Sequence, residues 1–163
     1  MSPRNVLPSE KSSRSRPPRG GRLFRYHTRY YLRRRAWRYF RKMAFQRKEA
    51  YAEAVARALV GYRDTDLTKG ENILDSWGLL QICFGESDAL EFRATHIELK
   101  EGRGLGELAA APRFPELWQT PKGAEILLSV VWQAQARLVR VWAIQWMRTV
   151  RQAVPMDLQP DRL

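Results

Sequence analysis

Positive charge is concentrated in the first third of this chain. Residues 1–48 hold sixteen Lys or Arg and a single acid, Glu10, for a net charge of +15, whereas residues 49–163 hold thirteen bases and sixteen acids. An unbalanced cationic segment attracts polyanions over a Debye length, about 8 to 10 Å at physiological salt, whereas a nearly neutral segment can pack as an ordinary domain. The charge division therefore predicts one folded domain behind a basic N-terminal extension.

The composition places the boundaries of that domain. Residues 2–22 consist largely of Ser, Arg, Pro and Gly, and such a segment has almost nothing to bury. We therefore expect a disordered basic arm at residues 1–22, a folded domain at residues 23–151 and a flexible tail at residues 152–163. The folded part is long enough to bury roughly two-thirds of the surface that its unfolded chain exposes.

The first predicted helix has an apolar face and a basic face. At about 100° per residue, one side carries Leu32, Ala36, Trp37, Tyr39, Phe40, Met43 and Ala44, and the other carries Arg34, Arg35, Arg38, Arg41 and Lys42. Arg33 falls inside the apolar arc, so we expect its head group to reach the edge of the arc or to pair with an acid there. The pattern indicates an amphipathic helix whose aromatic side faces a core.

The same periodicity predicts further helices near residues 47–62, 71–84, 121–134 and 137–151. Thr120 and Pro121 are expected as the N-cap and the first residue of the third of these, with Phe114 and Trp118 inserting beneath the last two helices. Residues 94–99 alternate weakly and lack a partner strand, so we predict a loop there. The predicted fold class is all-α, and the side chains expected in its core are Trp37, Phe40, Tyr51, Val55, Leu59, Ile73, Trp77, Leu80, Phe84, Leu128, Trp132 and Trp142.

Residues 139–147 read Val-Arg-Val-Trp-Ala-Ile-Gln-Trp-Met, which resembles the second helix of a HEAT-type repeat. The resemblance covers residues 120–151 and implies a helical scaffold that binds along a helix-lined surface. The sequence departs from the family at residues 135–137, where Gln-Ala-Arg stands in place of a turn with Asp, and no second copy follows at a period of about 40 residues. An irregular helical bundle and a short HEAT-like stack therefore remain equal alternatives.

The basic aromatic segment is the best candidate for a binding site. Guanidinium groups pair with phosphate oxygens through two hydrogen bonds, and aromatic rings stack on unpaired bases, so this composition suits RNA or DNA. An acidic protein and an anionic membrane are the alternative partners, and a helix that simply exposes its arginines and buries its aromatics has the same pattern. The predicted nucleic-acid-binding residues are Arg22, Arg25, Tyr26, Arg29, Tyr30, Tyr31, Arg34, Arg35, Arg38, Arg41 and Lys42.

Residues 64–70 resemble a calcium-binding loop only in their alternating polar residues. Lys69 stands where that loop needs Gly, and Asp75 stands where it needs a bidentate Glu. Helix capping by Thr65, Asp66 or Thr68 is the expected role instead.

The remaining polar motifs also lack a catalytic pattern. The glycine-rich residues 102–106 lack the lysine of a phosphate-binding loop. Cys83 lies between Ile82 and Phe84, where we expect a buried, inert thiol, and His96 is not placed to activate it. We therefore predict no catalytic residue, metal or cofactor.

The function predicted from these observations is a non-catalytic helical binding or scaffold module. A protein-interaction fragment of a longer helical-repeat protein is the first alternative, because large apolar residues surround the last helix at Trp142, Ile144, Trp146 and Met147. An enzyme of unknown class is the second. One cysteine, no secretory signal and no long apolar stretch favour a cytoplasmic location, with mitochondrial and nuclear locations left open.

Overall fold

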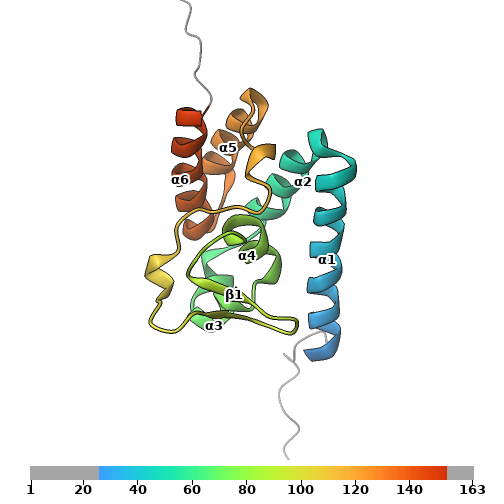
Figure 1. Ribbon diagram of the computed structural model, residues 1–163, viewed down its shortest axis with the longest axis vertical. Helices are drawn as coiled ribbons and strands as arrows, with labels where there is room; N and C mark the ends of the chain where they lie inside the picture. The colour runs from blue at the N-terminus through green and yellow to red at the C-terminus, as the bar shows by residue number, and fades with distance from the viewer. Residues whose placement is uncertain (1–25, 154–163) are drawn as a thin grey trace, which may run out of the picture.

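The computed structural model describes residues 26–153, without the side chains of residues 26, 27, 29 and 30 (Figure 1). This part of the chain is mainly helical, which confirms the predicted all-α class. The arm predicted at residues 1–22 and most of the predicted tail lie outside the described residues. The elements are α1 (Tyr26–Gln46), α2 (Lys48–Val60), η1 (Asp64–Leu67), α3 (Gly70–Leu74), α4 (Trp77–Phe84), β1 (Leu90–Phe92), β2 (Ile97–Leu99), η2 (Leu105–Glu107), η3 (Pro115–Leu117), α5 (Pro121–Gln133) and α6 (Arg137–Ala153), where η marks a short 3₁₀ helix.

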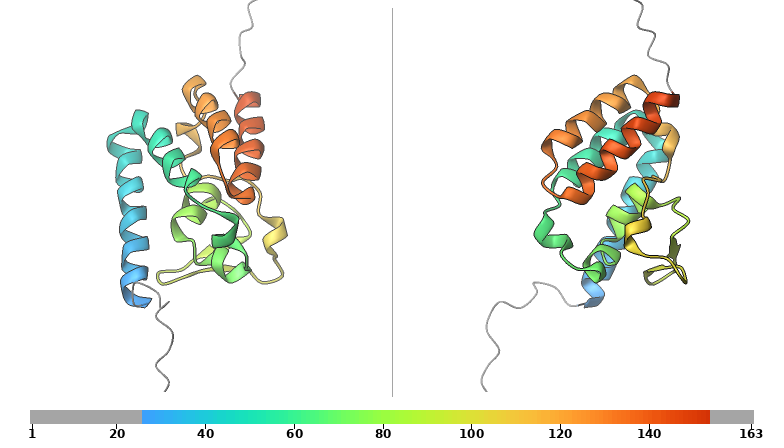
Figure 2. Two further views of the ribbon diagram at one scale, coloured as in Figure 1. Left: turned by 180° about the vertical axis from the view of Figure 1, so that it is seen from behind. Right: turned by 90° about the vertical axis from the view of Figure 1, so that its left-hand side faces the viewer.

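Helices α6, α5, α2 and α1 form a row in which each packs against the next (Figures 1 and 2). Helix α4 packs against α1, and the β1–β2 hairpin lies beside α4 at the lower end in Figure 1. Only Arg47 separates α1 from α2, so the chain reverses sharply between them. Helix α1 is therefore the edge of the row, with α2 and α4 covering one of its sides.

A series of aromatic contacts joins these helices. The ring of Trp118 is fully buried, and its centroid lies 5.4 Å from that of Trp142 in α6 and 6.3 Å from that of Tyr51 in α2. The ring of Phe114 lies 5.8 Å from Tyr51 and 6.3 Å from Trp37 in α1. Contacts of this kind add about 0.5 to 1.5 kcal/mol each beyond the burial of the rings. The predicted insertion beneath the last two helices is confirmed for Trp118, which contacts α6, whereas Phe114 packs against α1 and α2 instead.

Three residues fix the start of α5. The Thr120 hydroxyl accepts a hydrogen bond of 2.9 Å from the Gly123 amide, as an N-cap side chain does. Pro121 occupies the first helical position, where no amide hydrogen is needed. Gly123 lies so close to the Trp118 carbonyl that a Cβ at this position would collide with it. The predicted cap is confirmed, and this close approach holds Trp118 beneath α5.

The acidic loop after α2 caps two elements. One carboxylate oxygen of Asp66 accepts a hydrogen bond of 3.0 Å from the Arg63 amide at the start of η1. One carboxylate oxygen of Asp64 accepts a hydrogen bond of 2.6 Å from the amide of Arg137, the first residue of α6. A carboxylate at a helix N-terminus satisfies an orphan amide and complements the helix dipole. The capping role predicted for Asp66 is confirmed, and Asp64 ties this loop to α6.

The helix predicted at residues 71–84 is two helices. Helix α3 ends at Leu74 and α4 begins at Trp77. At the break, the Ser76 hydroxyl donates a hydrogen bond of 2.8 Å to the Asn72 carbonyl. Short polar side chains that bond to the nearby backbone compete with helical hydrogen bonds, and the apolar spacing does not reveal this competition.

The loop predicted at residues 94–99 is partly a strand. Strand β2 pairs antiparallel with β1, so that Leu90 lies opposite Leu99 and Phe92 opposite Ile97. The prediction was wrong because each strand has only three residues, too few for alternation to show.

Helix α5 turns a different face to the core than the one predicted. Leu127 and Val130 are buried, whereas Leu128 is 43% exposed and Trp132 is 81% exposed. Apolar residues occupy much of this helix, so periodicity alone does not choose its buried side. Phe40 and Ile73 are half-buried. The other residues predicted in the core are buried: Trp37, Tyr51, Val55, Leu59, Trp77, Leu80, Phe84 and Trp142.

Replacing Tyr51 by Phe is expected to stabilise the protein by about 1 kcal/mol, since a buried hydroxyl without a partner costs free energy. The Tyr51 hydroxyl is buried and has no hydrogen-bond partner among the described residues. Burial also raises the pKa of Tyr51 above its usual value. The tyrosinate therefore forms more readily in the unfolded chain, so the parent protein keeps its full stability below about pH 10 and loses stability as the pH rises from there toward the folded-state pKa of Tyr51.

Urea unfolding of both proteins at pH 7 and at pH 10.5 measures these effects. Tyr51→Phe should have the larger free energy of unfolding at pH 7 and should lose less of it at pH 10.5. A Tyr51→Phe protein less stable than the parent at pH 7 would show that the hydroxyl has a bonding partner.

Candidate nucleic-acid interface

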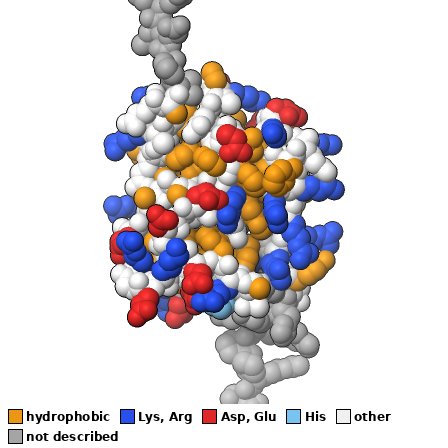
Figure 3. All heavy atoms as spheres, in the orientation of Figure 1, with side chains coloured by type: hydrophobic (Ala, Val, Ile, Leu, Met, Phe, Trp, Pro, Cys, Tyr) orange, Lys and Arg blue, Asp and Glu red, His pale blue; other side chains and the backbone are white. Residues whose placement is uncertain are grey.

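The exposed face of α1 carries most of the predicted binding residues. Helix α1 contains no acidic residue. Its buried side consists of Trp37, Met43 and Ala44, with Arg33 and Phe40 half-buried beside them. Figure 3 shows Lys and Arg side chains gathered along the edge of the molecule where α1 lies in Figure 1.

Three exposed cations mark the centre of this face, and we name them the cationic stripe: Arg35, Arg38 and Lys42. At 100° per residue they fall within about 60° of one another, and they extend over about 10 Å of the helix axis. Within the described residues, none of the three forms an ion pair. Their charge is therefore available to an anion from outside the domain.

Arg34 and Arg41 flank the cationic stripe. Arg41 is exposed, while Arg34 is half-buried and takes part in a contact with the protein. The structure thus brings all five basic residues predicted for this helix to one side of it.

Aromatic side chains lie among these cations. Tyr31 is 54% exposed, Tyr39 is 60% exposed and Phe45 is 63% exposed. Tyr31 and Phe45 lie at the two ends of the cationic stripe, about 21 Å apart along the axis. Their exposure gives α1 both charged and flat apolar surface on its outer face.

Two of these aromatic residues were not predicted as binding residues. The two are Tyr39 and Phe45. Tyr39 was expected on the buried face of α1 together with Leu32, but both side chains are exposed. The neighbours of α1 cover a narrower arc of the helix than its apolar residues occupy. Phe45 falls on the basic side at 100° per residue, and this spacing is the sequence signal that could have identified it. The ring of Phe45 lies 5.4 Å from Phe114, so it is also part of the packing.

The remaining predicted binding residues lie at or before the start of α1. The backbone of Tyr26, Arg29 and Tyr30 belongs to the first turns of the helix, and their side chains lie outside the described part of the chain. Arg22 and Arg25 lie outside the described residues altogether.

A groove of about 710 Å³ opens on the other side of α1, where that helix faces the loop after α2, α3 and the start of α4. We name it the α1–α4 groove. Arg33 lines it and lies 3.6 Å from the Asp75 carboxylate, which confirms the predicted pairing of Arg33 with an acid. Phe40, Tyr62 and Trp77 supply aromatic surface to its lining.

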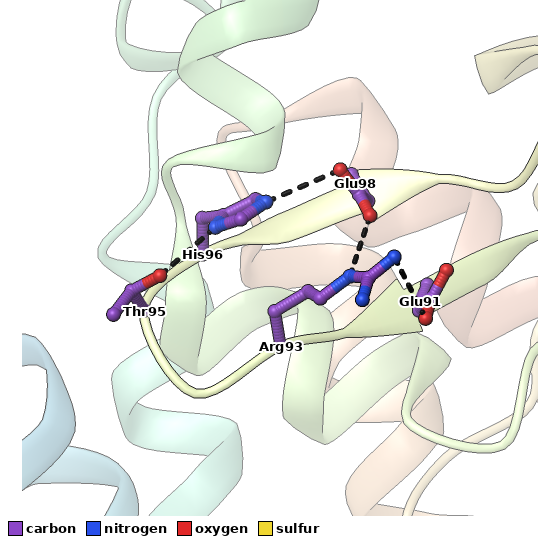
Figure 4. A network of polar contacts seen from close by, with 5 residues as sticks. All are labelled: Glu91, Arg93, Thr95, His96 and Glu98. Carbon is purple, nitrogen blue, oxygen red and sulfur yellow. Dashed lines mark hydrogen bonds and ion pairs between the residues drawn. The ribbon is translucent and has the colours of Figure 1, made fainter.

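The tip of the β1–β2 hairpin carries a connected polar network (Figure 4). The Thr95 hydroxyl lies 3.0 Å from Nδ1 of His96, and Nε2 of His96 lies 3.1 Å from one Glu98 oxygen. Arg93 donates to the other Glu98 oxygen at 2.7 Å and pairs with Glu91 at 3.1 Å. The hydrogen bond from Arg93 and the one from His96 lower the pKa of Glu98.

This network orders the hairpin tip. The contacts run from hydroxyl to imidazole to carboxylate, which is the connectivity of a Ser-His-Asp type of catalytic triad. However, about half of the His96 side chain is exposed to water, whereas catalytic relays operate in enclosed sites with preorganised donors. We therefore assign the network a structural role in the hairpin.

Other chemical groups offer little for catalysis or metal binding within the described residues. The Cys83 thiol is fully buried, and burial raises its pKa well above the usual value, as expected for an inert thiol. No cluster of three or more His, Cys, Asp or Glu that could hold a metal occurs among residues 26–153. In the same part of the chain, no helix combines the length and apolarity that a membrane crossing requires.

Comparison of the chain with protein-family models, with curated proteins and with solved structures found no match. The HEAT-like resemblance of residues 120–151 therefore stays a prediction.

Proposed function

We propose that this protein is a non-catalytic module that binds single-stranded RNA or DNA along the outer face of α1. One observation carries the proposal: on this face, cations without ion pairs in the described domain alternate with exposed aromatic rings. The cationic stripe would track the phosphates, and Tyr31 and Tyr39 would stack on bases.

The chemistry of this face favours single strands over duplexes. Proteins that bind single strands without reading sequence combine a cationic track with aromatic side chains, and each stacked base contributes about 1 to 3 kcal/mol. In a duplex the bases are stacked on one another and cannot reach Tyr31 or Tyr39, so only phosphate contacts remain. The strong positive charge of the N-terminal third adds attraction for either form.

Replacing Tyr31 and Tyr39 by Ala is expected to weaken binding of a ten-nucleotide single strand by about fivefold or more, since at least one stacked base is lost. Binding of a duplex should change little. Fluorescence anisotropy with labelled single-stranded and double-stranded oligonucleotides measures both affinities. Trp132→Ala is a matched control, because it removes an exposed aromatic side chain from α5 rather than α1.

Equal losses for single strand and duplex would contradict the stacking role. An effect of Trp132→Ala as large as that of the α1 variant would place the binding surface elsewhere.

A second candidate function is docking of another protein on α5. Trp132 is 81% exposed, and Leu128, one turn before it on the same face, is also exposed. Exposed large apolar side chains on neighbouring turns mark interaction surfaces more often than scattered single residues do. By contrast, Trp142 and Trp146 of α6, which motivated the fragment alternative, are buried.

A further inference from the structure

We propose that the α1–α4 groove binds a guanine base of the strand that lies along α1. The inference rests on the proposed function and adds a base preference to it. A volume of about 710 Å³ lies in the range of small-ligand sites and is large enough for a nucleobase. The aromatic and polar lining described above suits a flat ligand with a hydrogen-bonding edge.

The charge of the groove excludes a phosphate and favours the base. Its lining includes the carboxylates of Asp66 and Asp75 against the single guanidinium of Arg33. A phosphate would meet more negative than positive charge there, whereas the cationic stripe has the opposite balance. The backbone is therefore expected on the stripe, with a base turned into the groove.

The donors of guanine fit this lining best among the four bases. Guanine presents two adjacent N–H donors, N1–H and the N2 amino group, to a carboxylate, and its O6 accepts from a guanidinium. Cytosine, adenine and uracil each present only one donor group on the same edge. The Asp75 carboxylate lies 3.6 Å from Arg33, which is longer than a hydrogen bond, so both of its oxygens can accept from the two guanine donors while Arg33 donates to O6.

The stripe and the groove are close enough for one strand. Around α1, Tyr39 and Leu32 follow the cationic stripe, and Ala36 and Phe40 come next at the edge of the groove. The step from Arg35 in the stripe to Ala36 in the groove lining is about 100° around the helix, or roughly 9 Å at its surface. One nucleotide spans this distance between its phosphate and the far edge of its base.

Gly78 lines the groove and carries no side chain. A Cβ added at Gly78 would meet only the Tyr62 hydroxyl, at 3.9 Å, which is an ordinary contact. A larger side chain at this position would project into the groove without forcing the backbone to move. Gly78→Leu therefore blocks the groove, and Gly106→Leu is its matched control, since a Cβ at Gly106 meets no atom within 4 Å.

The test compares a ten-nucleotide uridine oligonucleotide with the same oligonucleotide carrying one central guanosine. For the parent protein, one guanine should tighten binding by about tenfold, the value of one good two-bond contact to a base. Gly78→Leu should abolish this preference while keeping the salt dependence of binding, and Gly106→Leu should keep both. If Gly78→Leu does not fold, the pair Asp66→Asn and Asp75→Asn, made together, should likewise remove the preference.

Each outcome decides between the two proposals. Binding of both oligonucleotides with equal affinity would overturn the groove and leave the α1 interface standing. A guanine preference that survives Gly78→Leu or the paired Asn variant would also overturn it. If neither oligonucleotide binds, the proposed function fails. The groove is then tested with free guanosine in NMR spectra. Absence of any shift of the Trp77 indole signal would overturn the proposal that the groove binds guanine.

Discussion

Replacing Trp118 by Ala is expected to destabilise the domain by about 3 to 5 kcal/mol, the cost of removing a fully enclosed indole. Trp118 is completely buried and joins Tyr51 of α2 to Trp142 of α6, and Gly123 of α5 lies against its carbonyl. Its loss thus removes the ring contacts with α2 and α6 at once, while the backbone contact with Gly123 remains. A domain of this size is stable by about 5 to 15 kcal/mol, so the variant should be close to unfolding at 37 °C.

Thermal and urea unfolding, followed by far-ultraviolet circular dichroism, measure this effect. Trp132→Ala is the control: its side chain is 81% exposed, so its free energy of unfolding should change by no more than about 0.5 kcal/mol. Similar losses for the two variants would mean that α5 does not turn the face described here toward the core.

Local signals in the sequence predict the helices well. Thr120 and Pro121 mark the start of α5 because their roles depend only on their immediate neighbours. The spacing of Tyr51, Val55 and Leu59 likewise identifies the buried face of α2, because few other residues of that helix are large and apolar.

Contacts between distant segments determine which face of a helix is buried and which strands pair, and the local sequence pattern does not specify these features. Trp132 is exposed because Leu127 and Val130 face the core, and the choice of this face depends on the helices that pack against α5. Strand β2 exists because β1 lies beside it, and neither strand shows a pattern of its own.

The candidate site was predicted in part. Net charge and helical spacing identify Arg35, Arg38 and Lys42, because an arginine on a polar face is exposed in almost any packing. Exposure of Tyr39 depends on how much of α1 its neighbours cover, and sequence does not state this. The α1–α4 groove depends on the break between α3 and α4, so the sequence carried no direct signal for it.

Neutralising the cationic stripe is expected to make nucleic-acid binding less dependent on salt. The triple variant Arg35→Gln, Arg38→Gln, Lys42→Gln loses three phosphate contacts. For a single strand, each contact contributes about 0.7 to the slope of log affinity against log salt concentration. The slope should therefore fall by about 2, and affinity at low salt should fall by tenfold or more. Stability should hold, since all three side chains are exposed.

The matched control carries the same change in net charge elsewhere. Arg57, Lys100 and Arg148 are exposed, and none of them forms an ion pair in the described part of the chain. Their combined replacement by Gln alters the overall charge by the same amount and leaves α1 intact. Any difference between the two variants thus reports the local surface of α1.

The most direct measurement is a salt titration of the affinity for one ten-nucleotide single strand, made in parallel with the parent protein, the stripe variant and the control variant. We predict the same slope for the parent and the control, and a slope smaller by about 2 for the stripe variant. Equal slopes for the two variants, or no binding by the parent even at low salt, would contradict the assignment of α1 as a nucleic-acid interface.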